Sequence, residues 1–591
     1  MVKRFLITTA LEETWRDDEP VLFLGEWCKR YGRKNLWSKM DAEMLPFHWD
    51  DRVKLHADYQ HLQELHERLL QDLTPQLNQI HGVDRSLRYW RILIGPWLGW
   101  FVQVLFDRWT SIQRSISHYD LAGTIVLKDQ EDSFVPNDHG EFQRFAVGDE
   151  WNHYIYATLL QQYTGVKCFE RSRSRESDLA ERTLPIGPQQ RVKNFLLVCY
   201  QQVASVFRKD EDAFLLATYL TRLDELRLYK RLGQIPQLWR LVLPIKVAVN
   251  RQHRQWVVNG ENLSAFETCV REMIPRQLPV VYLEGYSKLV EQTRTLPWPK
   301  KPKFIWTSNS LVGDDVFKAW AAEKVGNGSQ LVAGQHGGHY GVGRWSFFED
   351  HEVAVSDRFL SWGWTELGES KIKAVGALSQ KRPLRVKHSK QSRALLVTCV
   401  LPQFSYWMYS VFVSSQYLDY FDDQCKFVSA LPNSLQRKLT VRLFPADSNW
   451  AQFSRWRDRF PDLRLDEGGS KMNNLIRQSR LFISTYNATT FLESFSMNVP
   501  TVIYWNPNHW ELRDSAIPYF EELKRVSIFH ETPESAARHV VAVWDNVDDW
   551  WNSPEVREVL ECFKAQYCRQ SDGLLDRLEA AFGELMIDVE N

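Results

Sequence analysis

The sequence predicts an α/β protein with two domains built on parallel sheets, the first of which carries a large helical insertion. Three observations lead to this fold class. A β–α–β pattern runs from residue 303 to residue 334, a second alternation of strands and helices begins at residue 394, and helical periodicity dominates from about residue 51 to residue 292. Strands joined by a single crossover helix pair in parallel, so each alternating run predicts a Rossmann-like sheet.

The composition is that of a folded globular chain. It has 591 residues, with 73 Lys and Arg against 74 Asp and Glu, and 44% of the residues are hydrophobic. This length predicts about two to four domains. A net charge near zero provides no basic footprint for a nucleic-acid partner, so none is expected. The eight cysteines are spread out without a CxxC pair, which indicates reduced thiols in a cytoplasmic protein.

The first residues predict a strand that ends in a polar loop. Residues 5–8 form a short apolar run, and Thr8 and Thr9 at its end are followed by Glu12 and Glu13. We expect the threonines to line a cleft, because ligands of open α/β sheets bind beyond the carboxyl ends of the strands. Glu12 or Glu13 is then a candidate general base, and the alternative is two solvated carboxylates in a loop.

The predicted insertion is rich in amphipathic helices. Leucines recur at helical spacing in residues 55–73, and residues 194–232 show the same pattern. The longest apolar stretch, residues 92–106, is interrupted by Gly95-Pro96 and is shorter than the roughly 20 residues that a membrane span needs. It therefore predicts a buried helix, with contact to a membrane surface as the alternative.

A glycine-rich loop follows the strand predicted at residues 330–333. It reads GQHGGHYGVG, and glycines such as Gly337 and Gly338 let a ligand approach the backbone. Either His336 or His339 could take a proton from a hydroxyl group, because the pKa of imidazole is close to neutrality. We expect Gln335 and the residues after it to face an acceptor. The alternative is a tight turn with solvated histidines.

A strand, a hydroxyl-rich turn and a helix follow one another in residues 481–496, LFISTYNATTFLESFS. The N–H groups and the dipole at a helix N-terminus attract anions, and hydroxyl side chains add donors. Glu493, one turn inside the helix, could accept hydrogen bonds from ribose hydroxyls. The alternative is an ordinary helix start capped by Asn487 or Thr489. The predicted phosphate-binding residues are Ser484, Thr485, Asn487, Thr489 and Thr490.

Arg442 lies in another predicted strand, residues 440–445. Its guanidinium could bind a phosphate with two hydrogen bonds, or it could form an ordinary salt bridge. Metal-ligand spacings are missing, since the sequence has no HExxH motif and His61 and His66 are five residues apart. We therefore predict no metal and no other cofactor.

Seven motifs are spread over nearly the whole chain: TTALEETW, GPWLGWF, DEWNH, QHGGHYG, VSDRFLSWGW, RLFPAD and STYNATTFLESFSMNVPTVIYW. Together they resemble a family of bacterial transferases found with surface-carbohydrate genes. That family is similar in turn to the two-domain GT-B glycosyltransferases, the CDP-glycerol glycerophosphotransferases and the capsule-polysaccharide transferases. In those enzymes an HG-containing loop of the first domain faces the acceptor, and a Ser/Thr-rich turn of the second holds the donor's phosphates. The resemblance implies the first role for His336 with Gly337 and the second for the turn at residues 484–490.

These expectations combine into one prediction of architecture and activity. Residues 1–385 form an acceptor domain with the insertion at about 50–290, a polar linker leads to a donor domain at 386–560, and closing helices occupy 561–591. We expect a cytoplasmic, metal-independent glycosyltransferase, with contact to the inner face of the membrane left open. It would move a sugar or sugar-like group from a CMP-, CDP- or other nucleotide-linked donor to a hydroxyl of a surface glycan. The alternatives are a non-catalytic carbohydrate-binding or assembly protein and a sugar-nucleotide epimerase of the GT-B fold.

Overall fold

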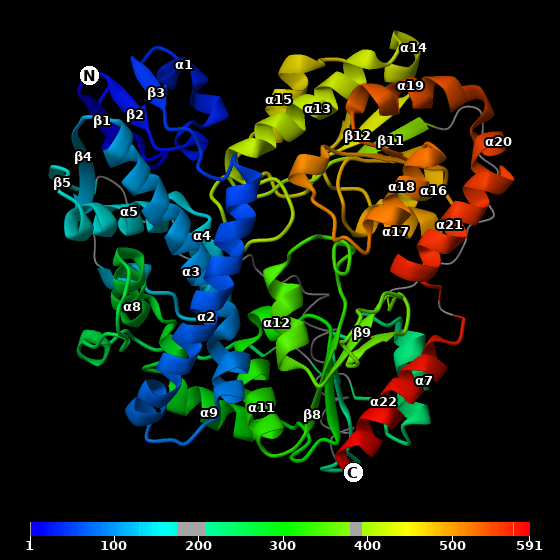
Figure 1. Ribbon diagram of the computed structural model, residues 1–591, viewed down its shortest axis with the longest axis horizontal. Coiled ribbons are helices and arrows are strands. Elements are labelled where there is room, and N and C mark those ends of the chain that lie inside the picture. Colours follow the sequence, from blue (N-terminus) through cyan, green and yellow to red (C-terminus); the bar gives the residue numbers. More distant parts are fainter. Residues whose placement is uncertain are drawn as a thin grey trace, which may run out of the picture.

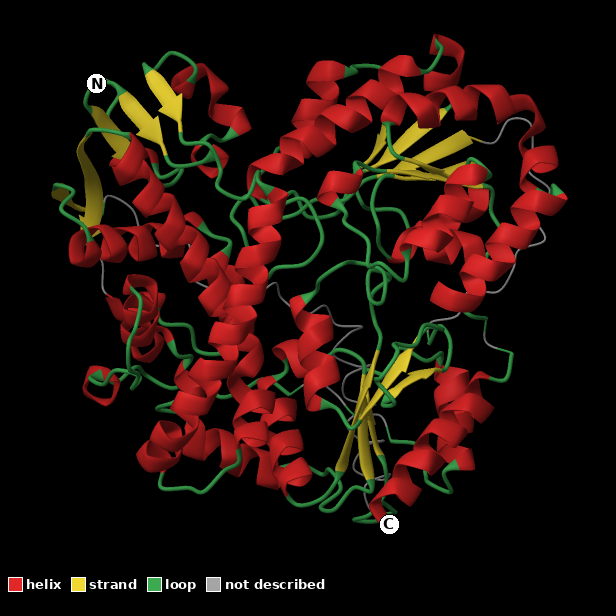
Figure 2. Cartoon of the chain, in the orientation of Figure 1, coloured by secondary structure: helices red, strands yellow, loops and turns green. Residues whose placement is uncertain are grey.

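The computed structural model describes residues 2–128, 131–173, 207–237, 239, 242–378, 393–570 and 572–590. Three separate sheets lie in this part of the chain, and every strand pairing between named strands is parallel (Figures 1 and 2). The predicted α/β class with parallel sheets is therefore confirmed. The linker predicted near residues 378–393 lies mostly outside the described residues.

The first sheet is formed by the N-terminal third of the chain. Its strand order is β3-β2-β1-β4-β5. Phe5, Leu6 and Ile7 of β1 are fully buried, because helices cover the sheet and leave no polar face to alternate with the apolar one. The strands are β1 (Arg4–Ile7), β2 (Val21–Phe23), β3 (Ala42–Met44), β4 (Leu121–Lys128) and β5 (Cys168–Ser172), and the helices are α1 (Lys34–Trp37), α2 (Arg52–His81), α3 (Leu87–His118), α4 (His139–Ala146) and α5 (Asp149–Tyr163).

The second sheet has the order β10-β9-β8-β7-β6. Residues 214–216, which the sequence placed in a helix, form its edge strand β6, because this buried apolar run pairs with β7. The strands are β6 (Phe214–Leu216), β7 (Phe304–Thr307), β8 (Gln330–Gly334), β9 (Arg358–Ser361) and β10 (Ile372–Ala374), and the helices are α7 (Arg222–Arg231), α8 (Ala265–Gln277), α9 (Tyr286–Thr295), α10 (Ser310–Gly313), α11 (Asp315–Gly326) and α12 (Phe347–Val355).

The third sheet has the order β13-β12-β11-β14-β15-β16, with β11 and β14 at its centre. Its strands are β11 (Arg393–Val397), β12 (Leu439–Arg442), β13 (Arg464–Asp466), β14 (Ser479–Ser484), β15 (Thr501–Tyr504) and β16 (Phe529–His530). Its helices are α13 (Tyr417–Ala430), α14 (Asn433–Gln436), α15 (Gln452–Arg459), α16 (Met472–Gln478), α17 (Thr489–Ser496), α18 (Ile517–Arg525), α19 (Pro533–Val543), α20 (Val547–Trp551) and α21 (Pro554–Tyr567).

Two long helices connect the first sheet with the second. Helix α2 packs on α3, and α3 also packs on α5, α11 and α12. The apolar stretch predicted as a buried helix lies inside α3, where Pro96 is accommodated within the helix. In the described part of the chain, no helix is both long enough and apolar enough to cross a membrane.

The region predicted as a helical insertion, about residues 50–290, holds these helices but also β4, β5 and β6. The N-terminal strand β1 therefore belongs to a sheet of its own, and the structure has three sheets where the sequence predicted two. At the other end, the predicted boundary at residue 560 falls inside α21. The last helix, α22 (Leu574–Glu590), returns to the second sheet, where Phe582 stacks on Phe304 with ring centroids 4.5 Å apart.

Candidate functional site

The glycine-rich loop leaves the carboxyl end of β8. Gln335, at its start, is buried and fully engaged: its amide donates to Gly337 O (2.9 Å), and its Oε1 accepts from the Trp362 backbone N–H (2.8 Å) and from Trp364 Nε1 (2.9 Å). The sequence predicted Gln335 among the residues that face an acceptor. These contacts show that it holds the shape of the loop instead.

His336 is partly accessible, with 22% of its side chain exposed. Its Nδ1 lies 3.7 Å from Glu352 Oε1, and its Nε2 lies 3.5 Å from the hydroxyl of Tyr340. Burial lowers the pKa of His336 to about 4, and a backbone hydrogen bond to Ser308 acts in the opposite direction. The imidazole is therefore neutral at physiological pH, and one ring nitrogen carries a lone pair that can accept a proton.

His339, the other histidine of the loop, has aromatic surroundings. Its ring packs edge-on against Tyr340, with centroids 4.6 Å apart, and lies 5.2 Å from the ring of Tyr409. Burial lowers the pKa of His339 to about 3. Glu352 faces His336 within an ion-pair distance, so His336 is the histidine with an acidic neighbour.

Helix α12 places acidic side chains beneath the loop, and the sequence prediction did not include them. Glu349 accepts from the Gly341 N–H (3.1 Å) and from Arg513 Nη2 (2.8 Å), and burial raises the pKa of Glu349 to about 7. Burial also raises the pKa of Glu352, which lies beside His336, well above its usual range. Three acids within the nine residues of an otherwise largely apolar helix are the sequence signal that could have identified them.

The hydroxyl-rich turn lies between β14 and α17. Ser484 Oγ donates to Tyr486 O (3.2 Å), Thr485 Oγ1 donates to Val397 O (2.9 Å), and both residues are buried. Their hydroxyls therefore hold the turn in place. Neither of the predicted caps is used, because the N-cap residue of α17 is Ala488, which makes no side-chain capping bond.

The backbone N–H groups at the N-terminus of α17 therefore have no side-chain cap from the N-cap residue. The first-turn N–H groups of a helix have no intrahelical acceptor, and the helix dipole favours negative charge there. Asn487 is only 2% exposed, yet its Oδ1 has no hydrogen-bond partner among the described residues. Thr490 Oγ1 donates to the Tyr486 hydroxyl (3.0 Å). Glu493 lies in the next turn of the helix.

The glycine loop and this turn touch each other. The Gly338 N–H donates to Thr489 Oγ1 (3.1 Å). A Cβ atom at Gly338 would stand 2.7 Å from the carbonyl carbon of Ala488 and 2.8 Å from its oxygen, so no side chain fits there unless the backbone shifts. Gly338 follows β8 and Thr489 follows β14, so the carboxyl ends of two parallel sheets meet at this point. Ligands of open α/β folds bind at such strand ends.

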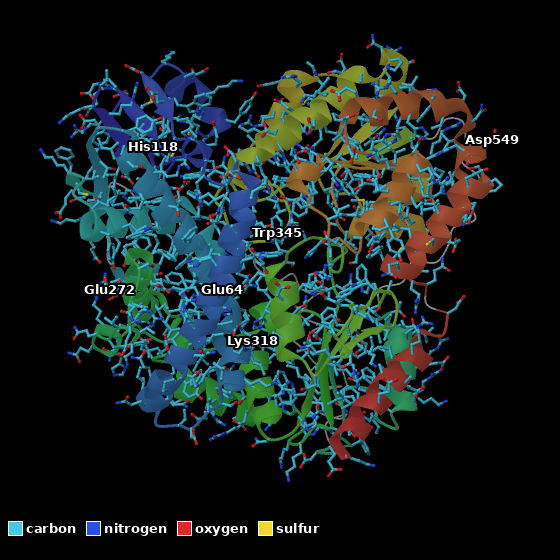
Figure 3. The ribbon with its side chains drawn as sticks, viewed as in Figure 1. Glu64, His118, Glu272, Lys318, Trp345 and Asp549 are labelled. Atoms are coloured by element: carbon cyan, nitrogen blue, oxygen red, sulfur yellow. The ribbon has the colours of Figure 1, made fainter. Side chains whose placement is uncertain are left out.

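Two further segments of the third sheet hold the loop. Gly343 forms an isolated bridge with Leu512 after β15, and Ser346 forms another with Tyr409 after β11. Trp345 (Figure 3) stacks on His56 of α2, with ring centroids 4.9 Å apart. The loop is therefore fixed from several sides although it is rich in glycine.

Arg442 ends β12 and is 6% exposed. It pairs with Asp466 of β13, and its Nη2 donates to Gly468 O (2.8 Å) and Ser470 O (3.2 Å). The sequence left open a phosphate contact or a salt bridge for Arg442, and the structure shows the salt bridge.

The N-terminal candidates follow β1 of the first sheet, which is a different sheet from the one that carries the glycine loop (Figure 1). Thr8 Oγ1 is 3.4 Å from His153 Nδ1, and Thr9 is fully buried. Glu12 accepts two hydrogen bonds from Arg33, at 2.5 and 2.6 Å. The structure does not bring Glu12 together with His336.

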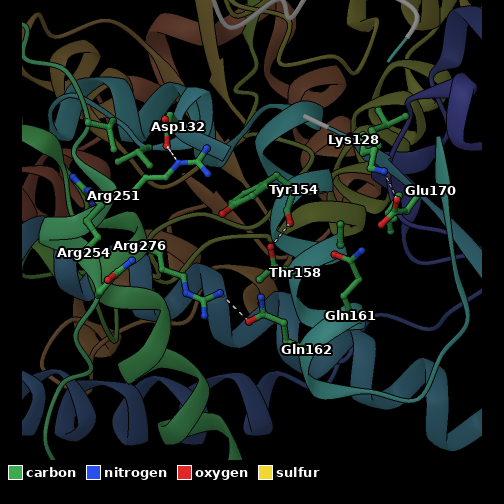
Figure 4. A pocket seen from close by; sticks show the side chains of 16 residues that line it. Lys128, Asp132, Tyr154, Thr158, Gln161, Gln162, Glu170, Arg251, Arg254 and Arg276 are labelled. Carbon is green, nitrogen blue, oxygen red and sulfur yellow. Dashed lines mark hydrogen bonds and ion pairs between the residues drawn. The ribbon is translucent and has the colours of Figure 1, made fainter. Parts of the chain in front are cut away.

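Two cavities of several hundred Å³ lie elsewhere in the described part of the chain. One of about 520 Å³ opens between β4, β5, α5 and residues 249–276, and Gln161, Arg251 and Arg276 are among the polar residues that line it (Figure 4). Another, of about 600 Å³, lies between α2 and residues 259–271. A narrow cavity of about 10 Å³ adjoins Thr485. The loop and the turn are thus packed on each other, with little free space beside Thr485.

Comparisons with solved structures give likenesses at low identity. The first is a Listeria monocytogenes protein described as a UDP-N-acetylglucosamine 2-epimerase, at 11% identity over 64% of this chain and 98% of that one, with a TM-score of 0.36. The wall teichoic acid polymerase TagF is 9% identical over 68% and 97% of the chains, with a TM-score of 0.27. WaaG, a glycosyltransferase involved in lipopolysaccharide biosynthesis, is 11% identical over 51% and 94%, with a TM-score of 0.26. All three TM-scores are below 0.5.

No curated protein matches the chain. A family model does, and it is described as the LIC12162 family transferase. It matches residues 4–582, which includes the glycine loop, the turn and all three sheets. The resemblance drawn from the motifs is thereby confirmed, and the protein is an enzyme of the transferase class. The chain belongs to the LIC12162 family of transferases.

Proposed function

We propose that this transferase moves a sugar or sugar-like group from a nucleotide-linked donor to a hydroxyl of a surface-glycan acceptor. The contact between Gly338 and Thr489 is the main support. It sets a loop that carries a neutral histidine against a helix N-terminus suited to phosphate. A base beside an anion site suits transfer from a nucleotide donor to a hydroxyl, because the base can take the hydroxyl's proton and the anion site can hold the leaving phosphate.

The donor's phosphates would rest at the N-terminus of α17. Thr489 Oγ1 accepts from Gly338 but still has its own proton to donate. The amide of Asn487 has an unpartnered oxygen, which could accept from a ribose hydroxyl. In the rotated orientation the amide would donate to a phosphate oxygen. Glu493, one turn further, would accept from the ribose. Such preset donors would stabilise the charge that develops on the leaving phosphate.

His336 would act as the general base. It is neutral at physiological pH, and Glu352 Oε1 lies 3.7 Å from its Nδ1. The Glu352 side chain could orient the ring while the imidazole takes the acceptor's proton. Glu12, the other candidate, follows β1 and is paired with Arg33, which favours His336.

The loop packs directly on the turn, so the donor would enter when the two separate. When the loop and the turn close again, they would exclude water from the activated donor and bring His336 towards the acceptor. The residues around the loop would then belong to the acceptor side, and those of the turn to the donor side.

Nucleotide binding tests the donor side. We expect one of CMP, CDP, UDP or GDP to raise the melting temperature of the wild type, by mass action on the native state. The double variant Thr489→Ala/Thr490→Ala should respond less. Ser496→Ala is the matched control, because it removes a hydroxyl from the other end of the same helix. If none of the four nucleotides at millimolar concentration shifts the melting temperature, the proposal is wrong.

Turnover tests the chemistry. Product should require donor and acceptor together, and His336→Ala should keep the nucleotide-induced shift but lose transfer by about 10²-fold or more. Conversion of the donor with no acceptor present would indicate a sugar-nucleotide epimerase instead.

A further inference from the structure

Tyr219 is an exposed aromatic residue in an unusual backbone conformation. It follows β6, its φ is +63°, and the φ of Ala217 is +53°. Left-handed φ values are costly for residues with a side chain, and they persist where the surroundings impose them. Even so, 41% of Tyr219 is exposed to solvent. The chain therefore holds a large aromatic ring at the surface in a conformation that glycine would adopt more easily.

Neighbouring contacts explain how this conformation is held. The Ser308 N–H donates to Ala217 O (3.2 Å), and Ser308 Oγ donates to Thr218 O (3.3 Å). Thr218 itself is buried. The segment after β6 is thus fixed on the end of the neighbouring strand β7.

The ring of Tyr219 lies beside the candidate base. It stacks on the ring of His336 with centroids 6.3 Å apart and an interplanar angle of 29°. Its hydroxyl accepts from Asn309 Nδ2 (3.0 Å), and Asn309 is itself exposed after β7. Tyr219, Asn309 and His336 thus follow the carboxyl ends of the adjacent parallel strands β6, β7 and β8 of the second sheet.

We propose that Tyr219 and Asn309 form a saccharide subsite of the acceptor, which rests on the proposed function and deepens it. A pyranose ring has an apolar face of C–H groups that packs on an aromatic ring, and hydroxyls around its rim. Tyr219 offers the aromatic face together with a polar edge. The exposed amide of Asn309 offers hydrogen bonds to rim hydroxyls. A saccharide bound there would lie against the ring that stacks on His336.

Saturation-transfer NMR tests the subsite without any need for turnover. The probes are methyl β-D-glucopyranoside, methyl N-acetyl-β-D-glucosaminide and methyl α-L-rhamnopyranoside at millimolar concentration. We expect the ring protons of at least one pyranoside to be saturated by the wild type and by Tyr219→Phe. Tyr219→Leu should weaken its binding by about three- to tenfold. Phe453→Leu, which removes an exposed aromatic residue on α15, is the control and should bind like the wild type.

The outcomes separate this inference from the proposed function. Saccharide binding that depends on Tyr219 in a protein that binds no nucleotide would leave the subsite standing and overturn the proposed transfer. Nucleotide binding without saturation of any pyranoside, or with equal saturation by the wild type and Tyr219→Leu, would overturn the subsite. In a transfer assay, Tyr219→Leu should raise the KM for the acceptor and leave the KM for the donor unchanged.

Discussion

Replacing Gly338 with alanine perturbs the contact between the glycine loop and the turn before α17. The new Cβ atom would stand 2.7 and 2.8 Å from the carbonyl carbon and oxygen of Ala488, which are backbone atoms and cannot rotate away. Forcing a methyl group into a packed site costs about 1–3 kcal/mol. Losing the hydrogen bond from the Gly338 N–H to Thr489 costs about 1 kcal/mol more. We therefore expect Gly338→Ala to weaken the packing of the second sheet on the third by about 2–4 kcal/mol.

Gly343→Ala provides a matched control within the same loop. The atom nearest to a Cβ at Gly343 is 3.5 Å away, an ordinary contact, so the methyl group fits. In thermal unfolding, Gly343→Ala should have the same melting temperature as the wild type. With about 2–4 °C per kcal/mol for domains of ordinary size, Gly338→Ala should melt about 4–16 °C lower. Hydrogen exchange should also rise in residues 335–346 and 485–492, but not in the first sheet, because the damage is local.

Equal melting temperatures for the two alanine variants would refute this reasoning. So would unchanged hydrogen exchange in both segments of Gly338→Ala. Either result would mean that the loop and the turn do not touch in solution. The proposed donor site would then lose the geometry on which it depends.

Three further predictions concern buried polar groups. Asp107→Asn should lower the free energy of unfolding by about 3–5 kcal/mol in urea titrations, because it leaves the fully buried charge of Arg108 without its carboxylate. Burial lowers the pKa of His66 to about 4, so the unfolded chain binds a proton first as the pH falls below 6.5. His66 should thus cost about 2 kcal/mol of stability between pH 7 and pH 5, and His66→Gln should remove that part of the pH dependence. Asn487→Ala should leave the melting temperature nearly unchanged, since Oδ1 has no partner to lose, while calorimetry should show nucleotide affinity reduced by about tenfold.

The sequence predicted strands such as β8 and β14, and it missed strands such as β6. β8 and β14 were predictable because each is a short buried run followed at once by glycine or hydroxyl residues. β6 was not, because residues 214–216 lie within a segment whose apolar spacing also fits a helix. Only pairing with β7, far along the chain, decides between the two. Short apolar runs are ambiguous until their tertiary partners are known.

In the candidate site too, the sequence identifies residues at strand ends but not those whose position depends on tertiary contacts. His336, Gly338 and Thr489 could be identified because each follows a strand, where ligands of α/β proteins bind. The sequence could not show that the hydroxyl of Ser484 is buried within the turn. It also could not single out Tyr219, because the position of that residue beside His336 depends on how β6, β7 and β8 lie next to one another.

Glu349 resolves an apparent conflict in the glycine loop. Glycine allows close approach to the turn, but it also gives the backbone freedom that would cost entropy to fix. Glu349 counters this freedom because it accepts a hydrogen bond from the Gly341 N–H and also pairs with Arg513, which lies between β15 and α18. One buried side chain thus links helix α12, the glycine loop and the segment between β15 and α18. His336 can therefore keep a defined position relative to α17 even though five of the ten loop residues 334–343 are glycines.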